Sequence, residues 1–216
     1  MFNGDKINVT ENRSVLHTAL RNFQTTKFNN LDSINKQLQV RFKSISNFCN
    51  HIRSGKKKSC SGDYFTDVVN IGIGGSELGP KLVTSALSEY HDGPKIHFVS
   101  NIDSSDINKV VKKLDPRKTL FVVSSKSFTT IETIYNSKTA IEWVCSKLGS
   151  DGMKNFVAVC SSKVKALDLG ISEENIFEFE EWVGGRFSVW GPIGLPVMLA
   201  IGLDHFSEFL EGASQI

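Results

Sequence analysis

The sequence predicts a doubly wound α/β fold: a five-stranded parallel sheet flanked by helices, with a helical arm at the N-terminus. Three observations lead to this prediction. Short, continuous apolar runs recur from residue 67 onward, amphipathic segments separate them, and a long amphipathic stretch precedes them. Strands that are apolar along their whole length, with helices between them, indicate a parallel sheet covered on both faces.

Residues 1–66 are predicted to form the helical arm. Thr10 or Asn12 could cap a short helix that runs on through Leu20. The stretch 31–52 places apolar residues at steps of three and four, which predicts one buried face of a long helix.

Residues 67–216 are predicted to contain the sheet. The five expected strands are 68–73, 96–99, 120–123, 156–159 and 176–179, and the helices between them are expected near 78–87, 107–114, 130–148 and 165–169. The last stretch, 188–211, is apolar and is predicted to be helical despite Pro192, Gly194 and Pro196. No repeat or low-complexity linker interrupts the series, so we count residues 1–216, arm included, as one domain.

The composition argues against several classes of protein. Lys and Arg total 25 against 23 Asp and Glu, so the overall charge does not indicate a nucleic acid or a membrane as partner. No stretch approaches the roughly 20 apolar residues of a membrane span, and the N-terminus lacks the apolar core of a signal peptide. The four cysteines are widely spaced and form no CxxC, so we expect reduced thiols and a cytoplasmic location.

The first candidate ligand-binding turn follows the first predicted strand. Open α/β sheets bind ligands at the carboxyl ends of their strands, and here the strand runs into the glycine-rich stretch 72–80. Glycines permit close approach, and the helix that follows presents free N–H groups to an anion. The dinucleotide motif GxGxxG fails at Glu77, and the P-loop motif fails at Pro80. On its own, the turn could equally be structural.

The turn after the third predicted strand favours phosphate binding. Residues 124–132 gather five hydroxyl side chains and one lysine at the start of a helix. Such hydroxyls donate hydrogen bonds that add to those of the helix N–H groups in holding a phosphate. The alternative is helix capping, which a single Ser or Thr satisfies at about 1 kcal/mol.

The third candidate segment is 181–190, which contains Gly184-Gly185-Arg186. Two glycines let the backbone turn tightly and aim the guanidinium, a planar and always charged donor that suits an anionic ligand or transition state. Taken alone, a surface arginine in a salt bridge is the simpler interpretation of Arg186.

Together these segments resemble the glucose-6-phosphate isomerase (phosphoglucose isomerase) family. Residues 69–80 look like the family's first glycine-rich turn, 124–133 look like its phosphate loop, and 181–194 fit one of its two diagnostic signatures. The stretches 1–8 and 15–22 also read like the start of the family's sequence. The resemblance spans the whole chain and implies a domain of the sugar-isomerase (SIS) type.

The resemblance implies an enzyme that interconverts glucose 6-phosphate and fructose 6-phosphate through a cis-enediolate, in glycolysis and gluconeogenesis. It implies a homodimer that needs neither a cofactor nor a metal. Arg186 would be catalytic and stabilise the enediolate, while Glu132 would orient a ring-opening histidine. The implied substrate-binding residues are Gly75, Ser76, Ser125, Lys126, Ser127, Phe128, Thr129 and Thr130.

The sequence also departs from the family. Ser127 replaces the usual Thr, which keeps the hydroxyl, and Ile131 replaces an expected Gln. The family's catalytic glutamate, ring-opening histidine and late lysine lie beyond Ile216, and the family also begins upstream of Met1. The resemblance therefore implies a chain trimmed at both ends and inactive by itself. None of its five histidines falls at a predicted ligand turn.

Two other functions compete with the isomerase hypothesis. One is a non-catalytic sensor of sugar phosphates built on the same fold, which would have no need of an enediolate-stabilising arginine such as Arg186. A dinucleotide-dependent oxidoreductase is more distant, because Glu77 already interrupts its motif.

Overall fold

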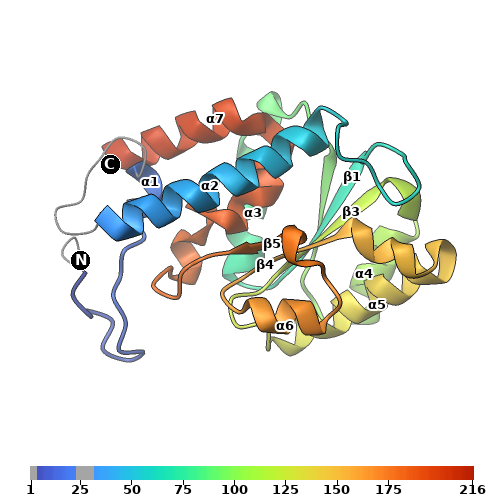
Figure 1. Cartoon of the computed structure of the whole chain (residues 1–216), viewed down its shortest axis with the longest axis horizontal. Coiled ribbons are helices and arrows are strands. Elements are labelled where there is room, and N and C mark those ends of the chain that lie inside the picture. The colour runs from blue at the N-terminus through green and yellow to red at the C-terminus, as the bar shows by residue number, and fades with distance from the viewer. Residues whose placement is uncertain (1–3, 23–31) are drawn as a thin grey trace.

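A five-stranded, wholly parallel sheet forms the centre of the computed structural model, which describes residues 4–22 and 32–216 (Figure 1). The strand order is β2-β1-β3-β4-β5, so the prediction of five parallel strands is confirmed. Each strand lies within two residues of its predicted position: β1 is Asp67–Ile71, β2 Lys95–Val99, β3 Thr119–Ser124, β4 Phe156–Cys160 and β5 Ile176–Glu178.

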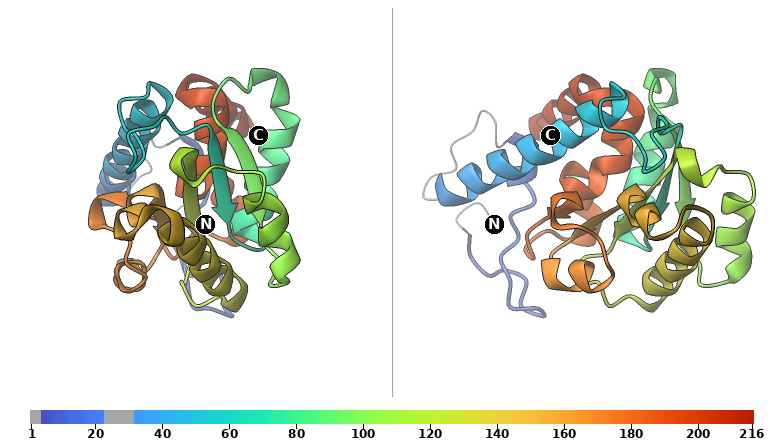
Figure 2. Two further views of the ribbon diagram at one scale, coloured as in Figure 1. Left: turned by 90° about the vertical axis from the view of Figure 1, so that its right-hand side faces the viewer. Right: turned by 45° about the vertical axis from the view of Figure 1, so that its right-hand side comes forward.

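Helices cover both faces of the sheet, as the apolar strands predict (Figure 2). Side chains alternate along a strand, so Val68 and Leu120 enter one core while Val69 and Phe121 enter the other. The first core is completed by α2 (Asp32–Arg53), α3 (Gly75–Ala86) and α7 (Leu195–Gln215), and the second by α4 (Ser104–Val111), α5 (Ile131–Leu148) and α6 (Lys163–Asp168).

The chain changes direction across the sheet between β1 and β3. From β1 it passes through α3 to β2 at one edge, and from β3 it passes through α5 toward β4 and the other edge. Because α3 and α5 cover opposite faces, the turns that follow β1 and β3 separate at this point. Such a switch point leaves a crevice at the carboxyl ends of the strands, where open α/β sheets bind their ligands.

The prediction of a long helix in the N-terminal arm is confirmed, whereas the prediction of a short helix before it is largely wrong. Helix α2 covers the predicted stretch apart from residue 31, which lies outside the described residues, as do Met1–Asn3. Neither Thr10 nor Asn12 caps a helix, because α1 is only Ala19–Asn22. Instead Asn8 and Arg13 pair in an antiparallel bridge.

The Asn8 side chain explains why the short helix does not start where the sequence predicts. Its Oδ1 accepts hydrogen bonds from the Thr10 hydroxyl at 2.8 Å and from the Glu11 N–H at 3.2 Å. Local hydrogen bonds of this kind compete with helix formation. The chain therefore turns between residues 8 and 13 before α1 begins.

The C-terminal apolar stretch corrects one expectation about membranes. Two short 3-10 turns, Gly185–Trp190 and Pro192–Gly194, precede α7. The segment Pro192–Gln215 is long and apolar enough to cross a membrane by length and composition, although no stretch of that kind was expected. Prolines and glycine interrupt it in the sequence, and 67% of its apolar window is buried inside the protein, as in a core helix.

Helix α7 consists of two helical pieces that meet at Gly202. The φ of Gly202 is 80° and its ψ is 169°, a combination that only glycine adopts without strain. The guanidinium of Arg53, at the end of α2, lies at the break. It donates to the carbonyl oxygens of Leu199 at 2.7 Å and Ala200 at 3.2 Å, and it pairs with Asp92 at 2.5 Å.

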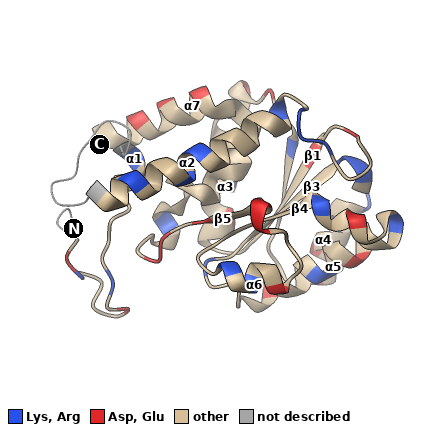
Figure 3. Cartoon of the chain, viewed as in Figure 1, with Lys and Arg blue, Asp and Glu red and all other residues tan. Residues whose placement is uncertain are grey.

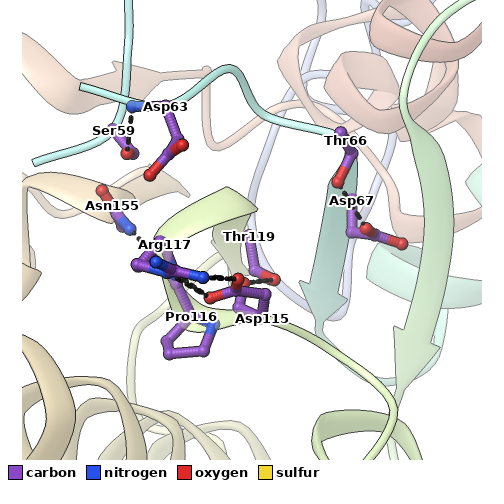
Figure 4. Close-up of polar contacts among 9 residues, drawn as sticks. All are labelled: Ser59, Asp63, Thr66, Asp67, Asp115, Pro116, Arg117, Thr119 and Asn155. Carbon is purple, nitrogen blue, oxygen red and sulfur yellow. Dashed lines mark hydrogen bonds and ion pairs between the residues drawn. The ribbon is translucent and has the colours of Figure 1, made fainter. Parts of the chain in front are cut away.

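At the amino-terminal ends of the strands, polar contacts hold the loops together (Figure 4). The Asn155 side chain donates to the Pro116 carbonyl at 2.9 Å and accepts from the Cys60 N–H at 3.0 Å. Asp115 accepts the N–H of Arg117 at 3.0 Å, and the two side chains form an ion pair at 2.7 Å. The polar groups of these loops are satisfied by hydrogen bonds and ion pairs within the loops. The carboxyl ends of the strands, at the opposite end of the sheet, are therefore the better place to look for a ligand.

Candidate functional site

The two turns that the sequence singles out start side by side at the carboxyl ends of β1 and β3, before their helices diverge to opposite faces of the sheet. Ile71 and Val123 are register partners in these strands, so the chains leave the sheet side by side. A Cβ on Gly72 would lie 2.8 Å from the carbonyl oxygen of Ser124 and 2.9 Å from the Cβ of Ser76. Only glycine fits at this close approach. Strand β1 ends just before it, at Ile71, two residues before the end of the predicted strand.

A fully buried amide, Asn70, links the two turns. Its Nδ2 donates to the Ser76 carbonyl at 2.9 Å, and its Oδ1 accepts from the Ser124 hydroxyl at 2.8 Å. Both ends of the amide are therefore satisfied, as a buried polar group requires. Sequence analysis did not single out Asn70, although a lone polar residue inside the apolar run Val68–Ile71 was a usable signal.

The glycine-rich turn leads directly into α3. Gly74 precedes the helix with φ of 62° and caps it without a side chain. Ser76 is half-buried in the first turn of α3. Glu77 is buried and pairs with Lys81 at 3.0 Å, so this carboxylate stabilises its own helix. Gly75 and Ser76 form the first turn of α3, where N–H groups attract anions, although the Ser76 N–H also donates to the Ile73 carbonyl at 3.3 Å.

The hydroxyl-rich loop has an inner and an outer set of residues. Ser125 is buried, and its Oγ accepts the N–H of Phe128 at 3.2 Å. Phe128 has a φ of 53° and a buried ring, so only its backbone can face a ligand. The exposed hydroxyls of Ser127 and Thr129 are hydrogen-bonded to one another at 2.6 Å. The loop thus exposes the hydroxyls of Ser127 and Thr129, while Ser125 and the ring of Phe128 are buried beneath them.

Thr130 and Glu132 lie where the loop becomes α5. Thr130 is the N-cap residue, yet its side chain makes no capping hydrogen bond. Its hydroxyl therefore does not serve the capping role that is the alternative to ligand binding. Glu132 is half-buried in the first helical turn and has no ion pair or hydrogen-bond partner within 4–22 and 32–216. A carboxylate at this position is favoured by the helix dipole.

The third candidate segment, residues 181–190, here called the arginine segment, packs on the first turn of α3. A Cβ on Gly75 would lie 2.4 Å from the Gly185 carbonyl oxygen and 2.7 Å from its Cα, so the two backbones are in direct contact. The Ser188 hydroxyl donates to the Gly185 carbonyl at 2.8 Å. Arg186 is exposed, and none of the described residues pairs with it. The salt bridge that was its simplest structural interpretation is not formed.

Lys126 joins the hydroxyl-rich loop to the arginine segment. Its Nζ donates to the carbonyl oxygens of Glu181 at 2.5 Å and Val183 at 3.0 Å. Burial lowers the pKa of Lys126, and the positive charge of Arg13 lowers it further. The side chain of Glu181 pairs with Arg13 at 3.6 Å, as expected for a carboxylate near several cations.

The histidines lie away from the turns, as the sequence predicts. His17 is buried and stacks on Phe187, with ring centroids 3.8 Å apart and an angle of 8° between the ring planes. Burial lowers the pKa of His17, as does the charge of Arg21. His97 lies within β2, where its Nε2 is 2.8 Å from the Asp67 carboxylate. His17 therefore packs, as a neutral ring, against the segment that carries Arg186.

The electrostatics of the site come from a few groups at the turns. Over the faces seen in Figure 3, acidic and basic residues are interspersed on the helices. At the loop, the Lys165 ammonium donates to the Ser127 carbonyl at 3.0 Å. Among the residues that the structure describes, no cluster of three or more His, Cys, Asp or Glu side chains could hold a metal ion. The arrangement suits an organic anion with a phosphate group at one end.

Comparison with known proteins gives consistent relatives. A profile of the family described as phosphoglucose isomerase matches residues 1–216. The glucose-6-phosphate isomerase of Chelativorans sp. (strain BNC1) is 50% identical over 99% of this chain and 39% of its own length. That of Bartonella bacilliformis (strain ATCC 35685 / KC583 / Herrer 020/F12,63) is 51% identical over 100% of this chain and 40% of its own length.

A solved structure agrees with the sequence comparisons. The crystal structure of a glucose-6-phosphate isomerase from Chlamydia trachomatis D/UW-3/Cx superposes with a TM-score of 0.80 at 31% identity. The match covers 95% of this chain and 38% of that one. The chain thus spans about 40% of the length of the curated relatives it matches.

The contact between Gly75 and Gly185 can be tested with two alanine substitutions. Gly75→Ala forces a Cβ into the Gly185 backbone, so we expect it to lower the free energy of unfolding by about 1–3 kcal/mol, the usual cost of overpacking. Gly184→Ala is the matched control, because its Cβ would meet only Phe187 at 3.7 Å, and its effect should stay within about 0.5 kcal/mol. Urea denaturation measures both, and equal losses would contradict the contact.

Proposed function

This chain belongs to the phosphoglucose isomerase family, and we propose that its protein catalyses the reversible isomerisation of glucose 6-phosphate and fructose 6-phosphate. One observation carries the proposal. A loop with outward hydroxyls and an exposed Arg186, which has no ion-pair partner in the described part of the chain, are held together at the switch point of the sheet. The loop would hold the phosphate, and the guanidinium would face the reacting end of the sugar.

The phosphate is proposed to bind between the starts of α3 and α5. The hydroxyls of Ser127, Thr129 and Thr130 would donate to its oxygens, together with backbone N–H groups of the loop and of Gly75 and Ser76. The phosphate does not change during isomerisation, so these contacts would bind the ground state and the transition state alike. Their contribution would be affinity and the orientation of the sugar.

Arg186 is proposed to stabilise the enediolate. Moving a proton between C1 and C2 places negative charge on an oxygen that is neutral in the substrate. A fixed guanidinium near that oxygen would lower the barrier, because it interacts more strongly with the transition state than with the ground state. A protein that only sensed sugar phosphates would gain nothing from such a group, so Arg186 favours the enzyme over the sensor.

The general base is proposed to come from the part of the family's length that these 216 residues do not span. Proton abstraction needs a base within hydrogen-bond reach of the proton. Glu77 is paired with Lys81, and Glu181 is paired with Arg13. Glu132 lies beside the phosphate loop, and the resemblance to the family supports the proposal that it orients the ring-opening histidine.

A homodimer in the cytoplasm is also proposed, with the resemblance to the family as its main support. Leu78 and Leu82 lie four residues apart on α3 and are 64% and 69% exposed, which a further protein surface would cover. The four cysteines are free thiols, which suits a reducing compartment.

A coupled enzyme assay tests the proposed activity. A version of the protein with the full length of its relatives should convert fructose 6-phosphate to glucose 6-phosphate, whereas the 216-residue chain should be at least 10²-fold slower. Loss of a general base typically costs about 10²–10⁴-fold. Turnover by the 216-residue chain within tenfold of the long version would mean that the base has been misplaced.

The phosphate loop can be tested by removing two of its hydroxyls. In the long version, Ser127→Ala with Thr130→Val should raise KM about tenfold or more while kcat stays within about threefold, since the phosphate is bound equally throughout the reaction. Thr139→Val is the control, because that hydroxyl donates to its own helix, to the Tyr135 carbonyl. A large loss of kcat with KM intact would contradict the assignment.

Arg186 should show the opposite kinetic pattern. Arg186→Ala should lower kcat by about 10²–10³-fold, which corresponds to the roughly 2.7–4 kcal/mol that one oxyanion donor contributes. Arg186→Lys should recover little of this, because an ammonium lacks the planar fork of the guanidinium. Steady-state kinetics of both variants test this prediction. An unchanged kcat in Arg186→Ala would show that Arg186 does not stabilise the transition state.

A further inference from the structure

We propose that Lys126 is a positioning residue, whose ammonium group holds the segment that carries Arg186 against the phosphate loop. The proposal rests on the isomerase function proposed above. A lysine inside a phosphate loop would ordinarily be assigned a direct ionic contact with the phosphate. The hydrogen bonds of Lys126 point to a different role, in which it joins the two halves of the site.

The geometry of Lys126 leaves its charge committed to backbone carbonyls. Its Nζ donates to Glu181 O at 2.5 Å and to Val183 O at 3.0 Å, which accounts for two of its three N–H donors. Its own backbone is also fixed, because the Lys126 carbonyl accepts the N–H of Ser161 at 2.9 Å and the Ser161 hydroxyl at 2.6 Å. Both ends of the side chain are therefore anchored, one in each segment.

Val183, Ser188 and Val189 are buried on either side of Arg186, but the two residues directly before it supply no side-chain contacts of their own. Gly184 and Gly185 have no side chains, and Gly185 touches the rest of the protein through its backbone contact with Gly75. After Arg186, the ring of Phe187 is held by the stacked ring of His17. Before the glycines, the two carbonyl bonds of Lys126 hold the chain, so the residue fixes one end of the segment that aims the guanidinium.

The charges around Lys126 explain why it binds carbonyls. Arg13 repels it, while Glu11 and Glu181 attract it. The Glu181 carboxylate is nevertheless paired with Arg13, and Glu11 lies 3.9 Å from the same guanidinium. With both carboxylates directed to Arg13, the carbonyl oxygens of the segment are the acceptors within reach of the ammonium. Hydrogen bonds from a charged donor are stronger than neutral ones, so the link is firm.

The two possible roles of Lys126 predict different kinetics. A phosphate ligand binds a group that does not react, so its loss raises KM and spares kcat. A positioning residue acts through Arg186, so its loss lowers kcat and has no further effect once Arg186 is gone. A misplacement of about 1 Å can reduce a rate by 10²-fold, and two lost carbonyl bonds allow a shift of this order.

A double-mutant cycle in the long version of the protein tests the proposal. Lys126→Met and Arg186→Ala are made singly and together, and kcat, KM and inhibition by inorganic phosphate are measured. We expect Lys126→Met to lower kcat about 10–100-fold, to leave KM and the phosphate inhibition constant within about threefold, and to add less than twofold to the loss in Arg186→Ala. Such non-additivity is the mark of residues that act together.

Two further variants keep the test decisive. Lys154→Met removes a lysine whose ammonium pairs with Asp151, outside both turns and the arginine segment, so its kcat should fall less than threefold. If Lys126→Met does not fold, the same cycle is run with Lys126→Gln, which is polar but too short to span the gap.

The outcomes separate this inference from the function on which it rests. A rise in KM and in the phosphate inhibition constant with kcat preserved would make Lys126 a phosphate ligand and overturn the proposal. Equal losses of kcat with and without Arg186 would overturn it as well. A wild-type protein that lacks isomerase activity would overturn the proposed function and the role of Lys126 together.

Discussion

The candidate site depends on a close approach of two backbones, at Gly75 and Gly185. A hydrogen atom in place of a side chain at Gly75 lets the segment before Arg186 lie directly on the first turn of α3. A Cβ at Gly75 would push the Gly185 backbone, and the segment that carries Arg186 with it, away from the first turn of α3. The place of the segment that carries Arg186 is thus set by the absence of a side chain at Gly75, in a contact between residues far apart in the sequence.

Polar groups buried beneath the site hold this arrangement in register. Asn70 joins the ends of β1 and β3 to the start of α3, and Ser125 supports the loop from below. Leaving one of these groups without its partner would cost about 1–3 kcal/mol, so the alternative arrangements of the turns are disfavoured. The hydroxyls of Ser127 and Thr129, which we propose to bind the phosphate, can then remain exposed, because the buried polar groups underneath hold the loop in place.

The sequence allowed the sheet to be predicted well, because each strand is a continuous apolar run and each turn at its carboxyl end has a distinctive composition. It also predicted that the turns after β1 and β3 lie at the same end of the sheet, since parallel strands end on one side, whereas the ligand-binding role of their residues stays a prediction. The features that could not be predicted depend on which groups a side chain bonds in the folded chain, and the type of residue does not reveal these groups. The direction of Lys126 is set by carbonyls 55 and 57 residues away, and the turn at Asn8 is set by a side chain that competes with a helix. Local patterns do not contain such information.

The break in α7 at Gly202 has a consequence for how the molecule comes apart. Arg53 ends the long helix of the N-terminal arm, and its guanidinium occupies the carbonyls of Leu199 and Ala200 beside the break. Detaching the arm would leave those carbonyls and a buried portion of the guanidinium without partners, in addition to the apolar faces that α2 and α7 share. Opening of the arm alone is therefore costly, and the arm and the sheet are expected to exchange their core amide hydrogens as a single cooperative unit.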